Sequence, residues 1–191
     1  MLENIPAAIG HALHGVRNKP EDLVWADPAF ADVPDIIQLT SPAFPPGGAI
    51  PAAHTEDGEG ISPPLEWIGV PPEAEALVLL VEDQDSPTPK PLVHAILPGL
   101  QARDGRLEPG ALPGKTGPGT VGTVGRNSFW QRAWLPPDPP TGHGPHRYVF
   151  QLFALDRAID ATAISGRGAL VKALHGHVLA LGTLTGTYER S

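Results

Sequence analysis

The clearest signal in the chain is a set of short apolar runs separated by polar segments. The runs "AEALVLLVED" at residues 74–83 and "PLVHAILPGL" at residues 91–100 are continuous and of strand length, which predicts two buried strands. The run "HRYVFQLFAL" at residues 146–155 alternates along its length, so that His146 and Tyr148 share one face of a third predicted strand.

Weaker patterns occur toward both ends of the chain. Residues 5–16 place apolar side chains at helical spacing, and residues 168–180 do so again behind Ser165, a residue type that commonly caps helices. Strand-like segments cover residues 36–44 and 182–190. These patterns predict a helix near each terminus and a strand that closes the chain.

Glycine and proline separate these elements. The chain has 22 glycines and 24 prolines, and residues 101–144 consist mostly of predicted loop. Such punctuation favours strands and turns over long helices. We therefore expect a mainly β, antiparallel fold with peripheral helices, in a single domain over residues 1–191. Within it, residues 1–35 would form an N-terminal helical extension, and residues 36–191 a β core with a C-terminal helix.

Composition and charge exclude several classes of partner. The formal net charge is −8, without a cluster of Lys and Arg, which disfavours nucleic acid and, in bulk electrostatic terms, anionic membranes. The chain has no cysteine, and its first residues lack the pattern of a signal peptide, so we expect a cytoplasmic protein. No apolar run approaches the roughly 20 residues of a membrane span, so an integral membrane protein is not expected.

Three sequence patterns resemble known catalytic or phosphate-binding motifs without their context. "GPGTVG" follows no predicted strand and contains a proline that removes a backbone donor, which argues against a dinucleotide-binding loop. "GALPGKT" is one residue short of a phosphate-binding loop. No G-x-S-x-G sequence is present, so a nucleophile elbow is not supported.

The polar residues at the end of the first buried run form the best candidate site. Asp83 and Asp85 close the run at residues 74–83, and His94 lies within the next run. In a hairpin with Asp85 opposite Leu92, Asp83 would lie opposite His94, and all three side chains would share one face. A carboxylate beside an imidazole favours its charged form and fixes its tautomer.

The third predicted strand adds two polar groups to this face. His146 begins that strand and Tyr148 follows on the same side. If the strand neighbours the hairpin, two aspartates, two histidines and a tyrosine form one pocket. Imidazoles can donate hydrogen bonds to an anion, and carboxylates can hold the imidazoles or receive an ammonium group, so the set suits a zwitterion or a phosphate monoester.

Other interpretations of the same residues stay open at this point. Asp-x-Asp at a strand end commonly forms a turn, and a strand histidine is commonly structural. Two carboxylates, two histidines and a tyrosine could also perform acid–base catalysis in a hydrolase or lyase, although no nucleophile with a paired base is evident. Two histidines and a carboxylate could hold a metal, and a pure interaction protein would have no use for the pocket.

Several motifs in order resemble the phosphatidylethanolamine-binding protein family, in its bacterial branch often called Raf-kinase-inhibitor-like. The matching segments are "SPAF", "SPPLEW", "VEDQDSPTPKPLVHAIL", "GPHRYVFQLFALD" and "GTYER", from about Leu39 to Arg190. The resemblance implies antiparallel β-sheets packed as a sandwich, with the C-terminal helix near a small anion pocket. It also implies that Ser86–Pro87 forms a tight cis turn beside the pocket.

The resemblance also implies which residues form the pocket. By motif position these are Asp83, Asp85, His94, His146 and Tyr148, with Asp138 and Pro139 in the wall.

The chain departs from the family pattern in two places. The segment from Asp83 to Pro87 contains Gln84 and Ser86, where the family usually has proline and alanine. The residues around His94 are aliphatic, where the family usually has aromatic ones. Trp130 and Trp134 are the aromatic residues available to replace those rings from the long loop.

Residues and resemblance together predict a soluble binding or regulatory protein rather than an enzyme. Its pocket would take an anionic or zwitterionic phosphate-type ligand, such as a phospholipid head group or a nucleotide, without a cofactor or metal. The resemblance implies modulation of a kinase or protease, and a homodimer is common among bacterial relatives.

Overall fold

The computed structural model describes residues 7–190, and the elements it contains in that range are mainly β-strands. Four strands form one sheet in the order β4-β3-β6-β7, and three form a second sheet in the order β1-β2-β5. All strand neighbours in both sheets are antiparallel. The strands are β1 (Gln38–Thr40), β2 (Leu65–Ile68), β3 (Ala76–Asp83), β4 (Leu92–Leu100), β5 (Gly105–Leu107), β6 (His146–Leu155) and β7 (Val178–Tyr188).

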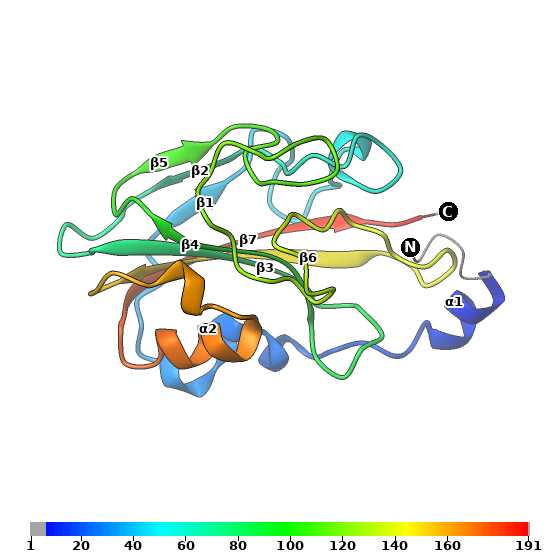
Figure 1. Ribbon diagram of the computed structural model, residues 1–191. Coiled ribbons are helices and arrows are strands. Elements are labelled where there is room, and N and C mark those ends of the chain that lie inside the picture. The colour runs from blue at the N-terminus through cyan, green and yellow to red at the C-terminus, as the bar shows by residue number, and fades with distance from the viewer. Residues whose placement is uncertain (1–6, 191) are drawn as a thin grey trace.

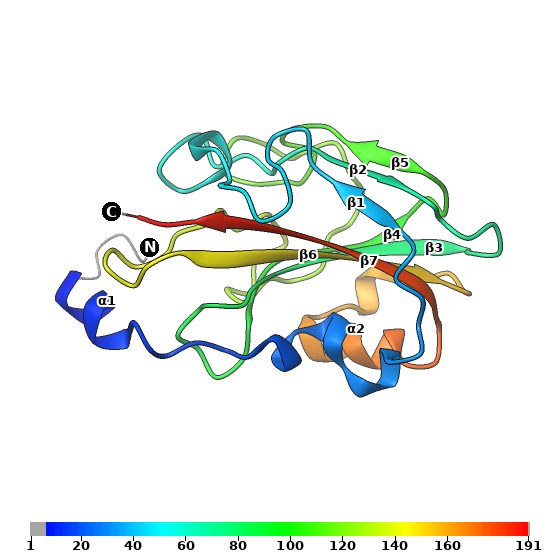
Figure 2. The same ribbon diagram turned by 180° about the vertical axis from the view of Figure 1, so that it is seen from behind.

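α2 and the short helices between residues 20 and 30 lie on the opposite side of the large sheet from the small sheet, whereas the short helix at residues 52–54 lies on the same side as the small sheet (Figures 1 and 2). The α-helices are α1 (Ala7–Leu13) and α2 (Arg167–Leu174). The short 3-10 helices are η2 (Pro20–Asp22), η3 (Val24–Ala26), η4 (Pro28–Phe30), η5 (Ala52–His54) and η6 (Ala161–Ala163). The predicted mainly β class, with packed antiparallel sheets and peripheral helices, is confirmed.

The large sheet is buried on both faces, which explains the continuous apolar run of β3. Leu77 and Leu79 pack into the core between the two sheets, and Val78 and Leu80 pack into a second core beneath the helices. A strand covered on both sides needs apolar residues at every position, not at alternate ones.

A buried carboxylate attaches the N-terminal segment to this sheet. Glu82 of β3 is fully buried, and its Oε2 accepts hydrogen bonds from the Val24 backbone N–H at 3.1 Å and from Gln151 Nε2 at 2.8 Å. Its Oε1 pairs with Arg167 Nε at 2.6 Å. One acidic side chain thus joins the N-terminal segment, the sheet and α2, which explains a charge inside an apolar strand.

The predicted helices are longer than the observed ones. α2 ends at Leu174, because Gly176 adopts φ +79° and the chain turns directly into β7. Its N-cap is Gly166, so Ser165 does not have the predicted capping role. α1 ends at Leu13 and Val16 is exposed, while Ile5 lies outside the described residues.

The second sheet was largely missed. β1 falls inside the predicted segment at residues 36–44, but β2 and β5 lie in regions predicted as loop. Both are very short, at four and three residues, so they offer too little alternation to be recognised.

The predicted register of the hairpin was wrong. Asp83 pairs with Leu92, while Val81 pairs with Ala95 and Glu82 with Val93. His94 is therefore the extra residue of a β-bulge, which aims its side chain differently from that of a regular strand residue.

The turn of this hairpin also differs from the expectation. The described chain contains no cis peptide bond, so Ser86–Pro87 is trans. The Ser86 hydroxyl instead closes the turn, because it accepts a hydrogen bond from the Leu92 backbone N–H and donates to the Asp83 carbonyl oxygen.

Candidate functional site

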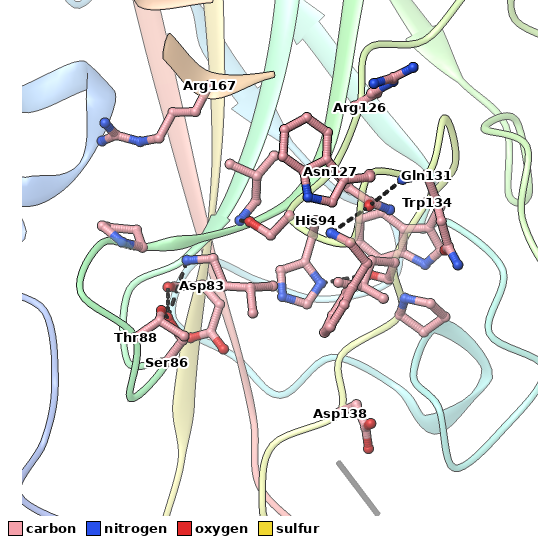
Figure 3. A pocket seen from close by; sticks show the side chains of 18 of the residues that line it. Asp83, Ser86, Thr88, His94, Arg126, Asn127, Gln131, Trp134, Asp138 and Arg167 are labelled. Carbon is pink, nitrogen blue, oxygen red and sulfur yellow. Dashed lines mark hydrogen bonds between the residues drawn. The ribbon is translucent and has the colours of Figure 1, made fainter. Parts of the chain in front are cut away.

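A pocket of about 1270 Å³ lies at the end of the large sheet where β3 finishes and β6 begins. Most of its lining comes from three segments, at residues 86–94, 126–136 and 165–167, and most of the lining is apolar. In Figure 3, His94 lies between Asp83 and Trp134, with Arg126 and Arg167 on one side and Asp138 on the other.

A chain of hydrogen bonds runs from the pocket to the N-terminal segment. His146 Nδ1 lies 2.7 Å from Asp83 Oδ2, and His146 Nε2 lies 2.7 Å from His143 Nδ1. His143 Nε2 lies 2.8 Å from the carbonyl oxygen of Leu13, at the end of α1. His143 and His146 are almost completely buried, so these contacts are shielded from water.

His94 lines the pocket, and one of its ring nitrogens has no hydrogen-bond partner among the described residues. Its Nδ1 lies 2.6 Å from the Leu135 carbonyl oxygen, which can only accept, so Nδ1 carries the hydrogen. Its Nε2 is buried and has no hydrogen-bond partner among the described residues. Burial lowers the pKa of His94 below its usual value, although the charge of Asp83 opposes this shift. The ring is therefore neutral at neutral pH, and Nε2 accepts hydrogen bonds.

Two aromatic side chains frame His94. Tyr148 meets its ring edge-on, with the ring centroids 5.1 Å apart, and burial raises the pKa of the Tyr148 phenol well above its usual value. Trp134 lies 6.2 Å from His94 between ring centroids and stacks on Phe150. Trp134 Nε1 and the Tyr148 hydroxyl are buried and lack a hydrogen-bond partner within residues 7–190. The ring of His94, which has an acceptor without a partner, thus neighbours the ring of Trp134, which has a donor without one.

Comparison with known proteins identifies the family. The family model for phosphatidylethanolamine-binding protein matches residues 40–189, which is well over half of the chain. The chain belongs to the phosphatidylethanolamine-binding protein family. A UPF0098 protein of Methanothermobacter thermautotrophicus is 37% identical over 164 residues, covering 81% of this chain and 99% of the relative.

Solved structures from bacteria agree with this family assignment. The phosphatidylethanolamine-binding protein homologue CT736 of Chlamydia trachomatis superposes with a TM-score of 0.73 at 35% identity, covering 82% of this chain and 99% of the homologue. YbcL of E. coli superposes with a TM-score of 0.71 at 28% identity, covering 81% of this chain and 99% of YbcL. Members of this family are generally binding proteins rather than enzymes.

Four of the residues predicted for the family pocket lie together. Asp83 and His146 are hydrogen-bonded, and Tyr148 contacts the rings of both His94 and His146, so the predicted convergence is confirmed. Asp83, His94 and His146 line the pocket, whereas Tyr148 lies behind them.

Asp85 does not share the pocket face with Asp83. β3 ends at Asp83, so the alternation of side chains stops before Asp85. The Asp85 carboxylate accepts hydrogen bonds from the Arg147 backbone N–H and guanidinium at 2.7–2.8 Å and pairs with Arg17 at 2.9 Å. Burial alone would raise the pKa of Asp85, but these two arginines lower it to about 2. Asp85 is a structural anchor rather than a lining residue.

The two wall residues differ in position. Asp138 lines the pocket and pairs with Arg190, which also holds Asp57. The Pro139 carbonyl oxygen accepts a hydrogen bond from the same arginine at 3.4 Å, outside the lining. The C-terminal end of the chain thus fixes this wall.

Of the two tryptophans considered as replacement rings, one lies beside His94. Trp134 has that position, whereas Trp130 is 72% exposed at the edge of the pocket. The sequence interpretation missed His143 and the contribution of the N-terminal segment, which lies outside the family match. The two histidines three residues apart in "GHGPH" were the available signal.

Two alternative roles for the site can be compared with its geometry. Within residues 7–190, no group of three or more His, Cys, Asp or Glu side chains could hold a metal ion. Both nitrogens of His146 are engaged, by Asp83 and His143, so this ring has no lone pair facing a substrate.

Among the described helices, none is long and apolar enough to cross a bilayer.

Proposed function

We propose that the protein binds a small zwitterionic or phosphate-bearing ligand whose head group contacts His94 and Trp134. The observation that carries the proposal is the pair of buried atoms without partners, His94 Nε2 and Trp134 Nε1. A buried polar group without a partner is costly, and a ligand that bonds both atoms would remove that cost. The pocket is large enough for a drug-sized molecule.

The chemistry of the two atoms favours a zwitterion over a simple anion. Trp134 Nε1 can only donate, which suits a phosphate oxygen, whereas neutral His94 Nε2 accepts, which suits an ammonium or hydroxyl group. The expected binding of an anion by two cationic imidazoles is less well supported, because His94 resists protonation and His146 is sealed beneath His143. A phosphoethanolamine head group has both the donor and the acceptor that the pair requires.

Calorimetric titration with glycerophosphoethanolamine, compared with inorganic sulfate, tests the proposal. Wild-type protein should bind the zwitterion more tightly at neutral pH, and His94→Gln should weaken its binding by about tenfold, as expected for one lost hydrogen bond of about 1.4 kcal/mol. His54→Gln is the matched control, since His54 is a buried histidine with Nδ1 on a backbone carbonyl, outside the pocket. Equal affinity in the wild-type and His94→Gln proteins would refute the role of His94.

The acid–base hydrolase or lyase alternative is checked in the same preparation. Turnover of phosphoester or carboxyester substrates that disappears in His146→Ala would establish it. Modulation of a kinase or protease and a homodimer stay predictions from the family resemblance, and a cytoplasmic location stays a prediction from the absence of cysteine and of a signal-peptide pattern.

A further inference from the structure

Trp130 is exposed at the edge of the pocket in a strained backbone conformation. It is the one non-glycine residue with positive φ, at +63°, that the structure describes. Its side chain is 72% exposed. A large side chain at positive φ costs free energy, and an exposed indole gains nothing from the protein core. Neither local backbone preference nor core packing accounts for this tryptophan.

The loop that presents Trp130 is rigid. Buried Asn127 accepts hydrogen bonds from the Phe129 and Gln131 backbone N–H groups at 3.0 and 3.1 Å, and its amide donates to the Ala133 carbonyl oxygen. Ser128 exchanges hydrogen bonds with Val93 of β4. The backbone that carries Trp130 is therefore held beside the pocket.

Two exposed cations line the same pocket as this indole. The Arg126 guanidinium lies 5.8 Å from the centre of the Trp130 ring, a cation–π arrangement. Lys90 lies in the pocket-lining loop at residues 86–91, and both cations are exposed. Within the described chain neither has an ion-pair partner. We call Lys90, Arg126 and Trp130 the Trp130 rim.

The acidic groups of the pocket do not cancel these charges, because each already has a partner. Glu56 pairs with Lys115, Asp83 with His146, and Asp138 with Arg190. The overall charge of −8 resides elsewhere and is screened beyond about 10 Å at ordinary ionic strength. The pocket opening is thus locally cationic on an acidic protein.

We propose that the Trp130 rim docks the pocket opening onto a phospholipid surface. The indole is suited to the interface between head groups and acyl chains, and the two cations to the lipid phosphates. The acidic remainder of the surface would be repelled by an anionic membrane, which orients the protein with its pocket toward the lipid. This inference rests on the proposed function, because docking would present a lipid head group directly to His94 and Trp134.

Cosedimentation with vesicles of phosphatidylcholine mixed with phosphatidylglycerol tests the docking. Wild-type protein should associate with these vesicles, and association should weaken as salt is added. Trp130→Gly should lower association by about tenfold, from the loss of an apolar contact, and Lys90→Gln and Arg126→Gln by about fivefold each. The urea midpoint of Trp130→Gly should not fall, because glycine tolerates this φ. Weaker docking without lost stability would distinguish a surface role from a structural one.

Control variants change equivalent groups on other surfaces. Ile68→Ala removes a side chain that is 55% exposed on the small sheet, and the double variant Arg106→Gln/Lys172→Gln removes two exposed cations. Both should associate like the wild type. Absence of vesicle association in the wild type, or unchanged association in the rim variants, would overturn the proposal. A rim that is needed for a protein partner but not for vesicles would overturn it as well.

Failure of the docking and failure of the proposed function are distinguishable. Glycerophosphoethanolamine in solution needs no docking, so Trp130→Gly should bind it with wild-type affinity if the proposal is correct. If His94→Gln loses vesicle association and Trp130→Gly keeps it, the association depends on the pocket, and the docking role of the Trp130 rim is overturned. Rim-dependent association without any head-group binding would support the docking surface and refute the proposed ligand.

Discussion

His143 Nδ1 lies 2.7 Å from His146 Nε2, and this contact fixes how many protons the site holds. The Leu13 carbonyl oxygen at one end and the Asp83 carboxylate at the other are joined by three hydrogen bonds through the two rings. Each bond needs one hydrogen, and two neutral imidazoles supply only two. The three side chains therefore share one additional proton, which balances the charge of Asp83.

Removal of His143 should loosen the N-terminal segment. His143→Ala leaves His146 Nε2 buried and without its partner, which should lower the free energy of unfolding by about 1–3 kcal/mol. It also frees the Leu13 carbonyl, so amide hydrogen exchange over residues 7–13 should accelerate. His11→Ala, on the exposed face of α1, should change neither quantity. Unchanged exchange in His143→Ala would contradict the role of the contact.

The buried histidines should make the protein less stable in mild acid. Burial lowers the pKa of both His94 and His143 below 6.5 in the folded state, so the unfolded chain binds more protons in that range. Their contribution to stability is present above the unfolded value and is lost as pH falls through the lower folded values. Urea unfolding at a series of pH values from about 7.5 to 5 measures this effect.

The double variant His94→Gln/His143→Gln supplies the control for that experiment. Glutamine does not titrate, so the dependence of its stability on pH should be flatter than that of the wild type. Equal slopes in the two proteins would mean that other groups cause the loss.

The sequence predicted the central strands because their burial leaves a strong pattern. β3 and β4 are covered on both faces, so their apolar runs are continuous. β6 was predicted from the alternation of side chains that begins at His146. The bulge at His94 left no such signal, since an extra residue in a ladder depends on the partner strand.

The part of the site that lies on the strands was predicted, and the part that lies on loops was not. Asp83 and His146 end and begin strands that pair with each other, so their proximity follows from topology. His143 lies in a loop and bonds to Leu13, 130 residues away, which no local periodicity can reveal. Asp85 was misplaced because the i, i+2 rule applies only within a strand, and β3 had already ended.

Asp85 should stabilise the protein at neutral pH and lose that effect in strong acid. Its pKa of about 2 lies below the usual 3.8, so its contribution is present above 3.8 and is lost as pH falls through about 2. The shift corresponds to about 2 kcal/mol, which Asp85→Asn should remove at neutral pH. Urea unfolding at neutral and acidic pH measures the stability lost in Asp85→Asn and its dependence on pH. Asp32→Asn, at an exposed position, is the control. A variant as stable as the wild type at neutral pH would contradict the anchoring role.

Trp134→Phe should separate ligand binding from stability at the pocket. The substitution keeps an aromatic ring beside His94 and removes Nε1–H, a buried donor without a partner among the described residues. Because an unpartnered buried donor is destabilising, its removal should offset part of the stability that is lost with the smaller packing area. The free energy of unfolding should therefore change by less than about 1.5 kcal/mol. Affinity for glycerophosphoethanolamine should nevertheless fall by about tenfold, since the phosphate loses its only indole donor at this position. Trp67→Phe is the opposite control: Trp67 Nε1 donates to the Arg103 carbonyl oxygen at 2.9 Å, away from the pocket, so that variant should lose stability and keep its affinity. If Trp134→Phe binds the ligand as tightly as the wild type does, the indole is part of the wall and does not recognise the head group.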